Sequence, residues 1–127
     1  MPAPVGPYSP LVLAGPLAVC SGQLGLRPGA SGPELVPGGT GPEATQALAN
    51  VAEVLAEAGL GWEDVVKVTV FLTDMADYQE LNRRYAEALG PARPARTVVA
   101  VAGLPLGAKV EVEVWARLPQ DPADPKR

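Results

Sequence analysis

Residues 65–89 read VVKVTVFLTDMADYQELNRRYAEAL, and this stretch decides the fold class. Its first eight residues are β-branched or apolar at nearly every position, which predicts a buried central strand over Val65–Leu72. Asp77 and Glu80 then form a helix-start signal, and Gly90 is a natural end for the helix. Between them the apolar residues recur at helical spacing: Tyr78, Leu81, Tyr85 and Leu89. The stretch predicts a strand followed by an amphipathic helix.

Upstream, the sequence predicts a hairpin, a long loop and a second helix. Leu11–Ala14 and Leu17–Ser21 are expected to be short strands around the turn Gly15-Pro16. Residues 24–42 are rich in Gly and Pro and predict a loop, with a short strand at 34–36. Thr40 and Glu43 have the spacing of a capping box, so a helix is expected from there to about Ala58, before Gly59.

Downstream, Arg96–Ala102 and Lys109–Arg117 are two further predicted strands. Strict alternation in the second puts its valines (Val110, Val112, Val114) on one face and its charges and Trp115 on the other. If residues 103–108 close a hairpin between the two strands, Arg96 shares the face of Glu111 and Glu113. We therefore expect an Arg and two carboxylates on the face that the helices leave uncovered.

The order of elements predicts an α+β domain with one mixed sheet and two helices packed on one face. The other face is then solvated or meets another subunit. A length of 127 residues fits a single domain, placed at residues 1–118, with a flexible polar tail at 119–127.

Composition excludes several classes of function. Histidine is absent and Cys20 is the one cysteine, which removes His-based triads, His- or Cys-ligated metal, and an intrachain disulfide. A net charge of −4 argues against nucleic-acid binding. No apolar run reaches the ~20 residues of a membrane span, and residues 11–20 lack a preceding basic region, so a cytoplasmic protein is expected.

The residues that remain for chemistry are few. Arg96 is either a surface or ion-pairing residue or the site of a bound carboxylate, which an Arg grips through two hydrogen bonds. Glu111 and Glu113 are either solvated or, without any His, the best candidates for a general base. Tyr8 follows Gly6-Pro7 and is an aromatic anchor.

Several segments carry a resemblance to a known family. In chain order they are Gly6–Ser9 (GPYS), Ser21–Gln23 (SGQ), Gln46–Leu48 with Asn50, residues 65–75, Asn82 with Tyr85, Pro94–Thr97 (PART) and Lys109–Glu113 (KVEVE). Together they resemble the RidA (YjgF) family of reactive-intermediate imine deaminases over about residues 5–118. The strand–helix junction and the Pro-Ala-Arg segment are the most specific parts.

The resemblance implies a chorismate-mutase-like fold and a homotrimer whose sheets face a central barrel, with active sites between subunits. It implies hydrolysis of 2-imino acids or their enamine tautomers, such as 2-iminobutanoate and 2-iminopropanoate, to 2-keto acids and ammonia. Pyridoxal-phosphate enzymes release these species. Neither a cofactor nor a metal is implied.

Carried over by motif, Arg96 binds the substrate carboxylate and Glu111 positions the attacking water. Tyr8, the Ser21-Gly22 pair and Asn82 are implied to line the substrate site. Some active relatives have Cys two residues after the Arg, where this chain has Val98, so thiol regulation of that kind is not expected. Two other functions stay open: a regulatory trimer that binds 2-keto acids without turnover, and a ribonuclease or translation inhibitor.

Overall fold

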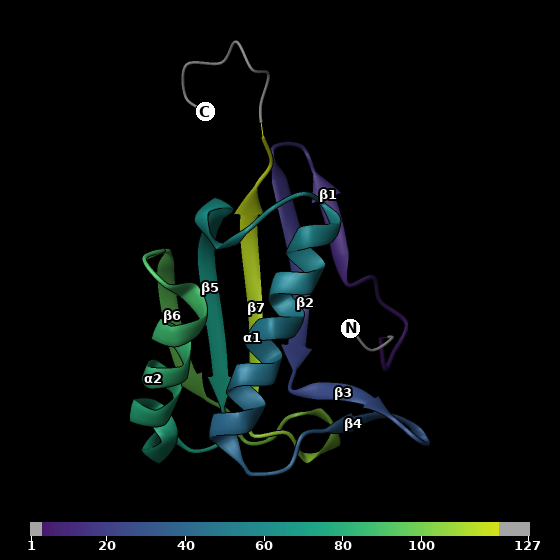
Figure 1. The fold of residues 1–127 in the computed structure, drawn as a ribbon, viewed down its shortest axis with the longest axis vertical. Coiled ribbons are helices and arrows are strands. Elements are labelled where there is room, and N and C mark those ends of the chain that lie inside the picture. Colours follow the sequence, from purple (N-terminus) through teal and green to yellow (C-terminus); the bar gives the residue numbers. More distant parts are fainter. Residues whose placement is uncertain (1–3, 120–127) are drawn as a thin grey trace.

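The structure, a computed structural model, describes residues 4–119. Within that range a five-stranded mixed sheet has the order β1-β2-β7-β5-β6, and β3 and β4 form a separate hairpin (Figure 1). The strands are β1 (Leu11–Ala14), β2 (Leu17–Leu24), β3 (Leu26–Gly29), β4 (Gly32–Leu35), β5 (Val65–Leu72), β6 (Ala95–Ala100) and β7 (Val110–Arg117). The α-helices are α1 (Thr40–Glu57) and α2 (Tyr78–Leu89). Short 3-10 turns lie at Trp62–Asp64, Met75–Asp77 and Pro105–Gly107.

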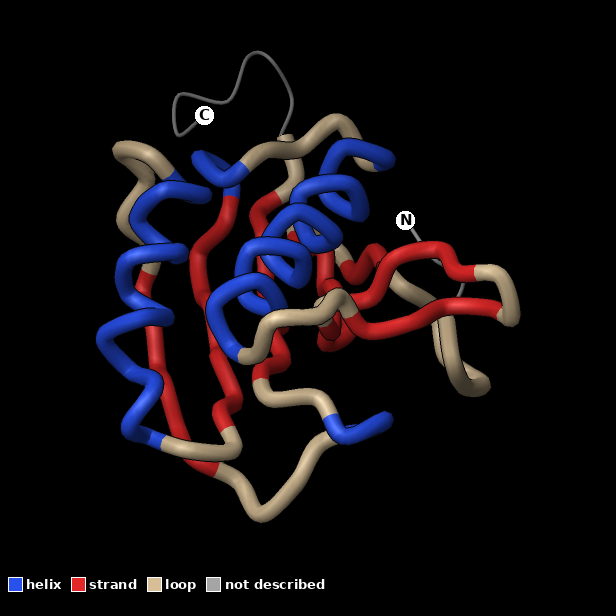
Figure 2. Tube along the Cα trace, turned by 60° about the horizontal axis from the view of Figure 1, so that its bottom comes forward, coloured by secondary structure: helices blue, strands red, loops and turns tan. Residues whose placement is uncertain are grey.

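Both α-helices cover the same face of the sheet, as expected (Figure 1, Figure 2). Alternate residues of β5 and β7 point toward them, and the three valines of β7 are fully buried. The same core takes Leu48, Val51 and Leu55 from α1 and Leu81, Tyr85 and Leu89 from α2. Each fully buried Val or Leu side chain contributes roughly 1.5–3 kcal/mol relative to an exposed one. This single core holds the sheet and both helices together.

The predicted hairpin between the last two strands is wrong. β6 pairs in parallel with β5, and β7 lies between β2 and β5, antiparallel to both. The reason is the helix α2, which carries the chain back across the sheet face, so that β6 runs in the same direction as β5. In this register Arg96 lies beside Val68, which is buried under the helices. Arg96 therefore faces α2, and not the uncovered side of the sheet.

The placement of the β7 charges is confirmed. Glu111, Glu113 and Trp115 pair with Phe71, Thr69 and Lys67, on the side opposite the buried valines. Trp115 is 45% exposed, and Val12 on the same face is 53% exposed. The uncovered face thus mixes carboxylates with large apolar side chains.

The predicted capping box at the start of α1 is also wrong. The N-cap is Gly39, and Thr40 is already helical. The Thr40 hydroxyl donates to Asp77 Oδ2 at 2.7 Å, and Glu43 Oε1 accepts from the backbone N–H of Lys109 at 2.9 Å. Asp77 precedes α2 as expected, but its side chain makes no capping bond. These polar residues connect elements that are distant in sequence.

The remaining expectations hold in part. The strand 65–72 and the helix up to Gly90 are confirmed. The expected loop 24–42 instead contains the β3–β4 hairpin, which extends away from the sheet in Figure 2. Of the predicted tail, all but residue 119 lies outside the described residues. Among residues 4–119 no helix is long and apolar enough to cross a membrane.

Candidate functional site

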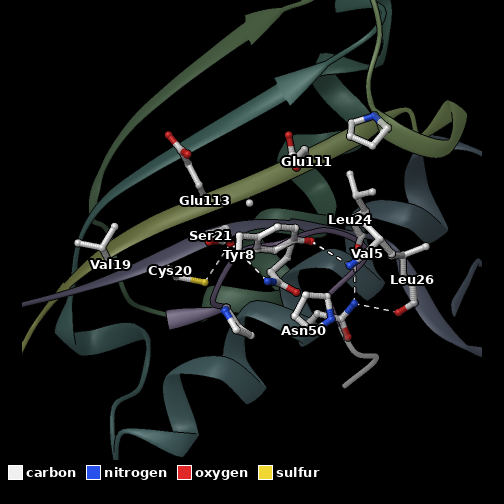
Figure 3. A pocket seen from close by; sticks show the side chains of 15 residues that line it. Val5, Tyr8, Val19, Cys20, Ser21, Leu24, Leu26, Asn50, Glu111 and Glu113 are labelled. Atoms are coloured by element: carbon white, nitrogen blue, oxygen red, sulfur yellow. Dashed lines mark hydrogen bonds between the residues drawn. The ribbon is translucent and has the colours of Figure 1, made fainter. Parts of the chain in front are cut away.

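A pocket of about 430 Å³ lies where the N-terminal segment passes over β2 and β7 (Figure 3). Four of the candidate residues line it: Tyr8, Ser21, Gly22 and Glu111. Glu113, Gln23 and Asn50 add polar groups, and the rest of the wall is mostly apolar. A largely apolar hollow with a few converging polar groups is the usual form of a small-molecule site.

Ser21 fixes the segment that carries Tyr8. Its backbone N–H donates to Pro10 O at 2.9 Å, and its hydroxyl donates to Ser9 O at 2.7 Å. The chain is thereby held against β2 just after Tyr8, and the Tyr8 ring lies over the pocket in Figure 3. The Tyr8 hydroxyl also accepts a long bond from Val5 N, at 3.4 Å. Ser21 thus has a positioning role in this structure.

Gly22 is packed directly against Glu111. A Cβ at residue 22 would lie 2.6 Å from Glu111 Oε2 and 2.7 Å from its Cδ. β2 has a register shift between Cys20 and Gln23, and this irregularity brings the Gly22 backbone onto the carboxylate of the neighbouring strand. The Glu111 carboxylate can occupy its place only because residue 22 has no side chain.

Burial raises the pKa of the Glu111 carboxyl, and the nearby Glu113 raises it further. Both effects disfavour the charged form, because a carboxylate loses water on burial and repels a like charge. A carboxyl group whose pKa is raised toward neutrality is a better proton acceptor than an ordinary surface Glu. This is the electrostatic signature expected of a functional acid or base in a pocket.

Arg96 is not part of this pocket. Its guanidinium lies on the helix side of edge strand β6, where Nη2 donates to the Tyr78 hydroxyl at 3.0 Å. Its Cζ lies 4.7 Å from the centre of the Tyr85 ring and 5.6 Å from that of Tyr78. Glu111 is two strands away and on the opposite face. The expectation that Arg96 and Glu111 share a face within one chain is therefore wrong.

Asn82 also lies apart from the pocket. It belongs to α2, on the turn between Tyr78 and Tyr85. Its Oδ1 is buried and, among the described residues, accepts no hydrogen bond. The candidate residues thus form two groups: Tyr8, Ser21, Gly22 and Glu111 on one side of the sheet, and Arg96 with Asn82 on the other.

Asn50 shapes the pocket, although the residue pattern alone gave it no role. Its side chain is 1% exposed, and Nδ2 donates to the carbonyls of Leu24 and Leu26 at 3.0 and 2.9 Å. Gln46 donates to its Oδ1 at 3.0 Å. The helix α1 thereby holds the chain where β2 passes into β3. A polar residue within the apolar stripe of α1 was the sequence signal.

Cys20 lines the pocket but is chemically quiet. Its side chain is 2% exposed, and burial, together with the charge of Glu113, raises the pKa of the thiol to about 12. The thiolate, which is the reactive form, is therefore scarce at neutral pH. In the described part of the chain, no cluster of three or more His, Cys, Asp or Glu side chains is placed to hold a metal ion.

Comparison with known proteins identifies the family. The family model described as Endoribonuclease L-PSP matches residues 1–118. The 2-iminobutanoate/2-iminopropanoate deaminase of Bos taurus is 47% identical over 115 residues, which are 91% of this chain and 82% of that protein.

Solved structures agree with this match. RidA from an Antarctic Psychrobacter is 38% identical with a TM-score of 0.84, over 92% of this chain and 93% of that one. TdcF of E. coli, solved with bound serine, is 33% identical with a TM-score of 0.84, over 93% of each chain.

The fold and the pocket define a small α+β protein with a carboxylate-bearing site on its sheet. The chain belongs to the RidA (YjgF) family.

Proposed function

We propose that this protein hydrolyses reactive 2-imino acids, such as 2-iminobutanoate and 2-iminopropanoate, to 2-keto acids and ammonia. The observation that carries the proposal is the Glu111 carboxylate, held in a pocket against Gly22 with its pKa raised. The names of relatives at this level of identity support the same activity.

We further propose that two copies of the chain build each site. Arg96 and Glu111 lie on opposite faces of one sheet, with Arg96 on the edge strand β6. The pocket lies near the other edge, at β2 and the N-terminal segment. Contact between these two edges of successive copies is head-to-tail, and such contacts close into a ring when the rotation between copies closes. A homotrimer of this kind brings Arg96 of one copy to the pocket of the next.

In the mechanism, Arg96 binds the substrate carboxylate and so fixes the position of C2. Glu111 accepts a hydrogen bond from a water molecule and directs its oxygen at C2 of the protonated imine. The C–O bond forms, one proton moves from oxygen to nitrogen, and the C–N bond breaks to release ammonia, which then takes the remaining proton from the hydroxyl oxygen. Iminium and water thus give a 2-keto acid and an ammonium ion, without any redox step. Orientation supplies much of the rate, because the iminium carbon is already electrophilic.

TdcF is solved with bound serine, an amino acid whose carboxylate lies next to a nitrogen-bearing carbon, and this supports a site of similar chemistry here. A 2-imino acid carries the same carboxylate next to a nitrogen-bearing carbon. Tyr8 and the apolar wall of the pocket are suited to short side chains on that carbon.

A steady-state assay with freshly generated 2-iminobutanoate tests the proposal. We expect hydrolysis above the spontaneous rate by the wild-type protein, and a loss of roughly a hundredfold or more in kcat/KM for Arg96→Ala. Arg96→Lys should recover little, because Lys lacks the planar fork. Binding of 2-oxobutanoate without any turnover would instead support a regulatory trimer.

The description of the family model makes RNA cleavage the other activity to measure. The net charge of −4 gives little attraction for phosphate. Cleavage of RNA by the purified protein that is lost in Arg96→Ala would favour a nuclease over a deaminase.

A further inference from the structure

We infer that Tyr78 and Tyr85 are positioning residues that hold the Arg96 guanidinium in one orientation for a ligand carboxylate. The inference rests on the carboxylate-binding role proposed above for Arg96. The helical spacing of these two residues of α2 predicts only that they pack against the core. The inference gives them a part in ligand binding as well.

The first argument is the geometry around the guanidinium. Arg96 lies on an edge strand, where a long side chain ordinarily samples many rotamers. Here its Cζ lies within 6 Å of both tyrosine ring centres, at 4.7 Å and 5.6 Å, and Nη2 donates to the Tyr78 hydroxyl. Arg96 is thus in cation–π contact with two rings and hydrogen-bonded to one of them. These contacts favour one side-chain orientation before any ligand arrives.

The second argument is the absence of a competing anion. Among residues 4–119, no carboxylate lies within ion-pair distance of Arg96. The carboxylate of Glu80, in helix α2, pairs instead with Arg83 and Arg84 of that helix. A guanidinium has five N–H donors, and one of them is used here, in the bond to Tyr78. Aromatic faces therefore hold the cation in place and leave most of its donors available for an anionic ligand.

The third argument is that the ring of Tyr85, and not its hydroxyl, makes the contact with Arg96. Tyr85 is 8% exposed and packs in the core, so its ring is a fixed surface. Its hydroxyl has no hydrogen-bond partner in the described part of the chain. The contact with Arg96 therefore needs the ring alone. Tyr78 differs, because both its ring and its hydroxyl contact Arg96.

The test measures the Kd of 2-oxobutanoate by calorimetry and KM and kcat for 2-iminobutanoate, with Tm on the same preparations. Tyr85→Leu and Tyr78→Leu should each weaken binding and raise KM by up to about tenfold, with a smaller effect on kcat. Tyr85→Phe, which keeps the ring, should match the wild type, and Tyr78→Phe should lie between Tyr78→Leu and the wild type. Leu55→Ala, at a fully buried residue of the other helix, α1, should lower Tm without raising Kd.

A second series repeats Tyr85→Leu in the Arg96→Ala background. If the tyrosine acts through Arg96, the additional change in Kd disappears there. Two outcomes overturn the positioning role of the tyrosines but leave the proposed role of Arg96 intact. One is an unchanged Kd and KM in both Leu variants, and the other is a weakening of binding by Tyr85→Leu that persists in the Arg96→Ala background. If Arg96→Ala hydrolyses the imine and binds 2-oxobutanoate as well as the wild type does, the proposed role of Arg96 is wrong, and the inference with it.

Discussion

The backbone of Gly22 lies against the carboxylate of Glu111, so closely that even a methyl group at residue 22 would overlap it. The two residues belong to neighbouring strands, and the irregular register of β2 brings them together. Gly22 does not have a positive φ, so its role here is to leave space, and the Glu111 carboxylate fills that space.

Gly22→Ala should therefore abolish most activity without unfolding the protein. The added Cβ meets the flexible end of the Glu111 side chain, which can move aside, so the cost falls on the position of the carboxylate. A displacement of about 1 Å in a catalytic group can lower kcat by roughly a hundredfold. The control is Gly103→Ala, where a Cβ meets nothing within 4 Å. Wild-type kcat in Gly22→Ala would contradict the assignment.

Glu111→Gln should be inactive and also more stable. The pKa of Glu111 is raised in the folded chain, so the folded state binds its proton more tightly than the unfolded state does. The free energy of unfolding therefore decreases as pH rises from the ordinary pKa of the unfolded chain to the raised pKa of the folded chain. At a pH above both values the ionised Glu111 carboxylate destabilises the folded state. Replacing it with a neutral amide removes that cost. We expect Glu111→Gln to have a higher Tm than the wild type at pH 7 and an equal Tm at a pH below the ordinary carboxyl pKa. A lower Tm at pH 7 would contradict the idea that the ionised Glu111 carboxylate destabilises the fold.

The acid side of the pH–rate profile should report the same group. In the proposed mechanism Glu111 accepts a hydrogen bond from water in its ionised form, so we expect kcat/KM to fall as pH drops through the pKa of Glu111, which lies above the ordinary value of 4.5. Glu113→Gln removes one of the two causes of the shift and should move this midpoint to lower pH. Lys67→Gln, on the same sheet face but outside the pocket, is the matched control. An unmoved midpoint in Glu113→Gln would mean that another group titrates.

Mixing two inactive variants tests whether each site is shared between subunits. If the proposed homotrimer forms, Arg96→Ala and Glu111→Gln chains that are unfolded and refolded together should give some sites with both residues intact. With random assembly, roughly a quarter of the wild-type activity should return. Each variant refolded alone is the control. If mixing restores nothing while trimers form, Arg96 and Glu111 do not act in one shared site.

The sequence predicted local structure well and the partnership of distant strands poorly. The alternation in residues 109–117 and the apolar run 65–72 each predicted a strand, and the structure has strands there, each with one buried face. Such patterns are readable because side chains alternate between the two faces of a strand. The period of two cannot show which strand is the neighbour. The error over β6 placed Arg96 on the wrong side of the sheet.

The same limit applies to polar contacts. Thr40 and Glu43 have the spacing of a capping box, yet their side chains bind Asp77 and the backbone of Lys109. Tertiary partners replaced the local ones. The motif order, by contrast, singled out Tyr8, Ser21, Gly22 and Glu111, and these four residues line one pocket.

The buried thiol of Cys20 gives the protein an internal probe of its own opening. It lies in β2 beside the pocket, at 2% exposure, and the sequence has no second cysteine to confuse the signal. A thiol reagent can react only when β2 opens, so the labelling rate measures the free energy of that local opening. A ligand that binds the closed pocket slows labelling in proportion to its occupancy. Affinity for a 2-keto acid can therefore be measured from labelling kinetics alone, in variants that have lost all turnover.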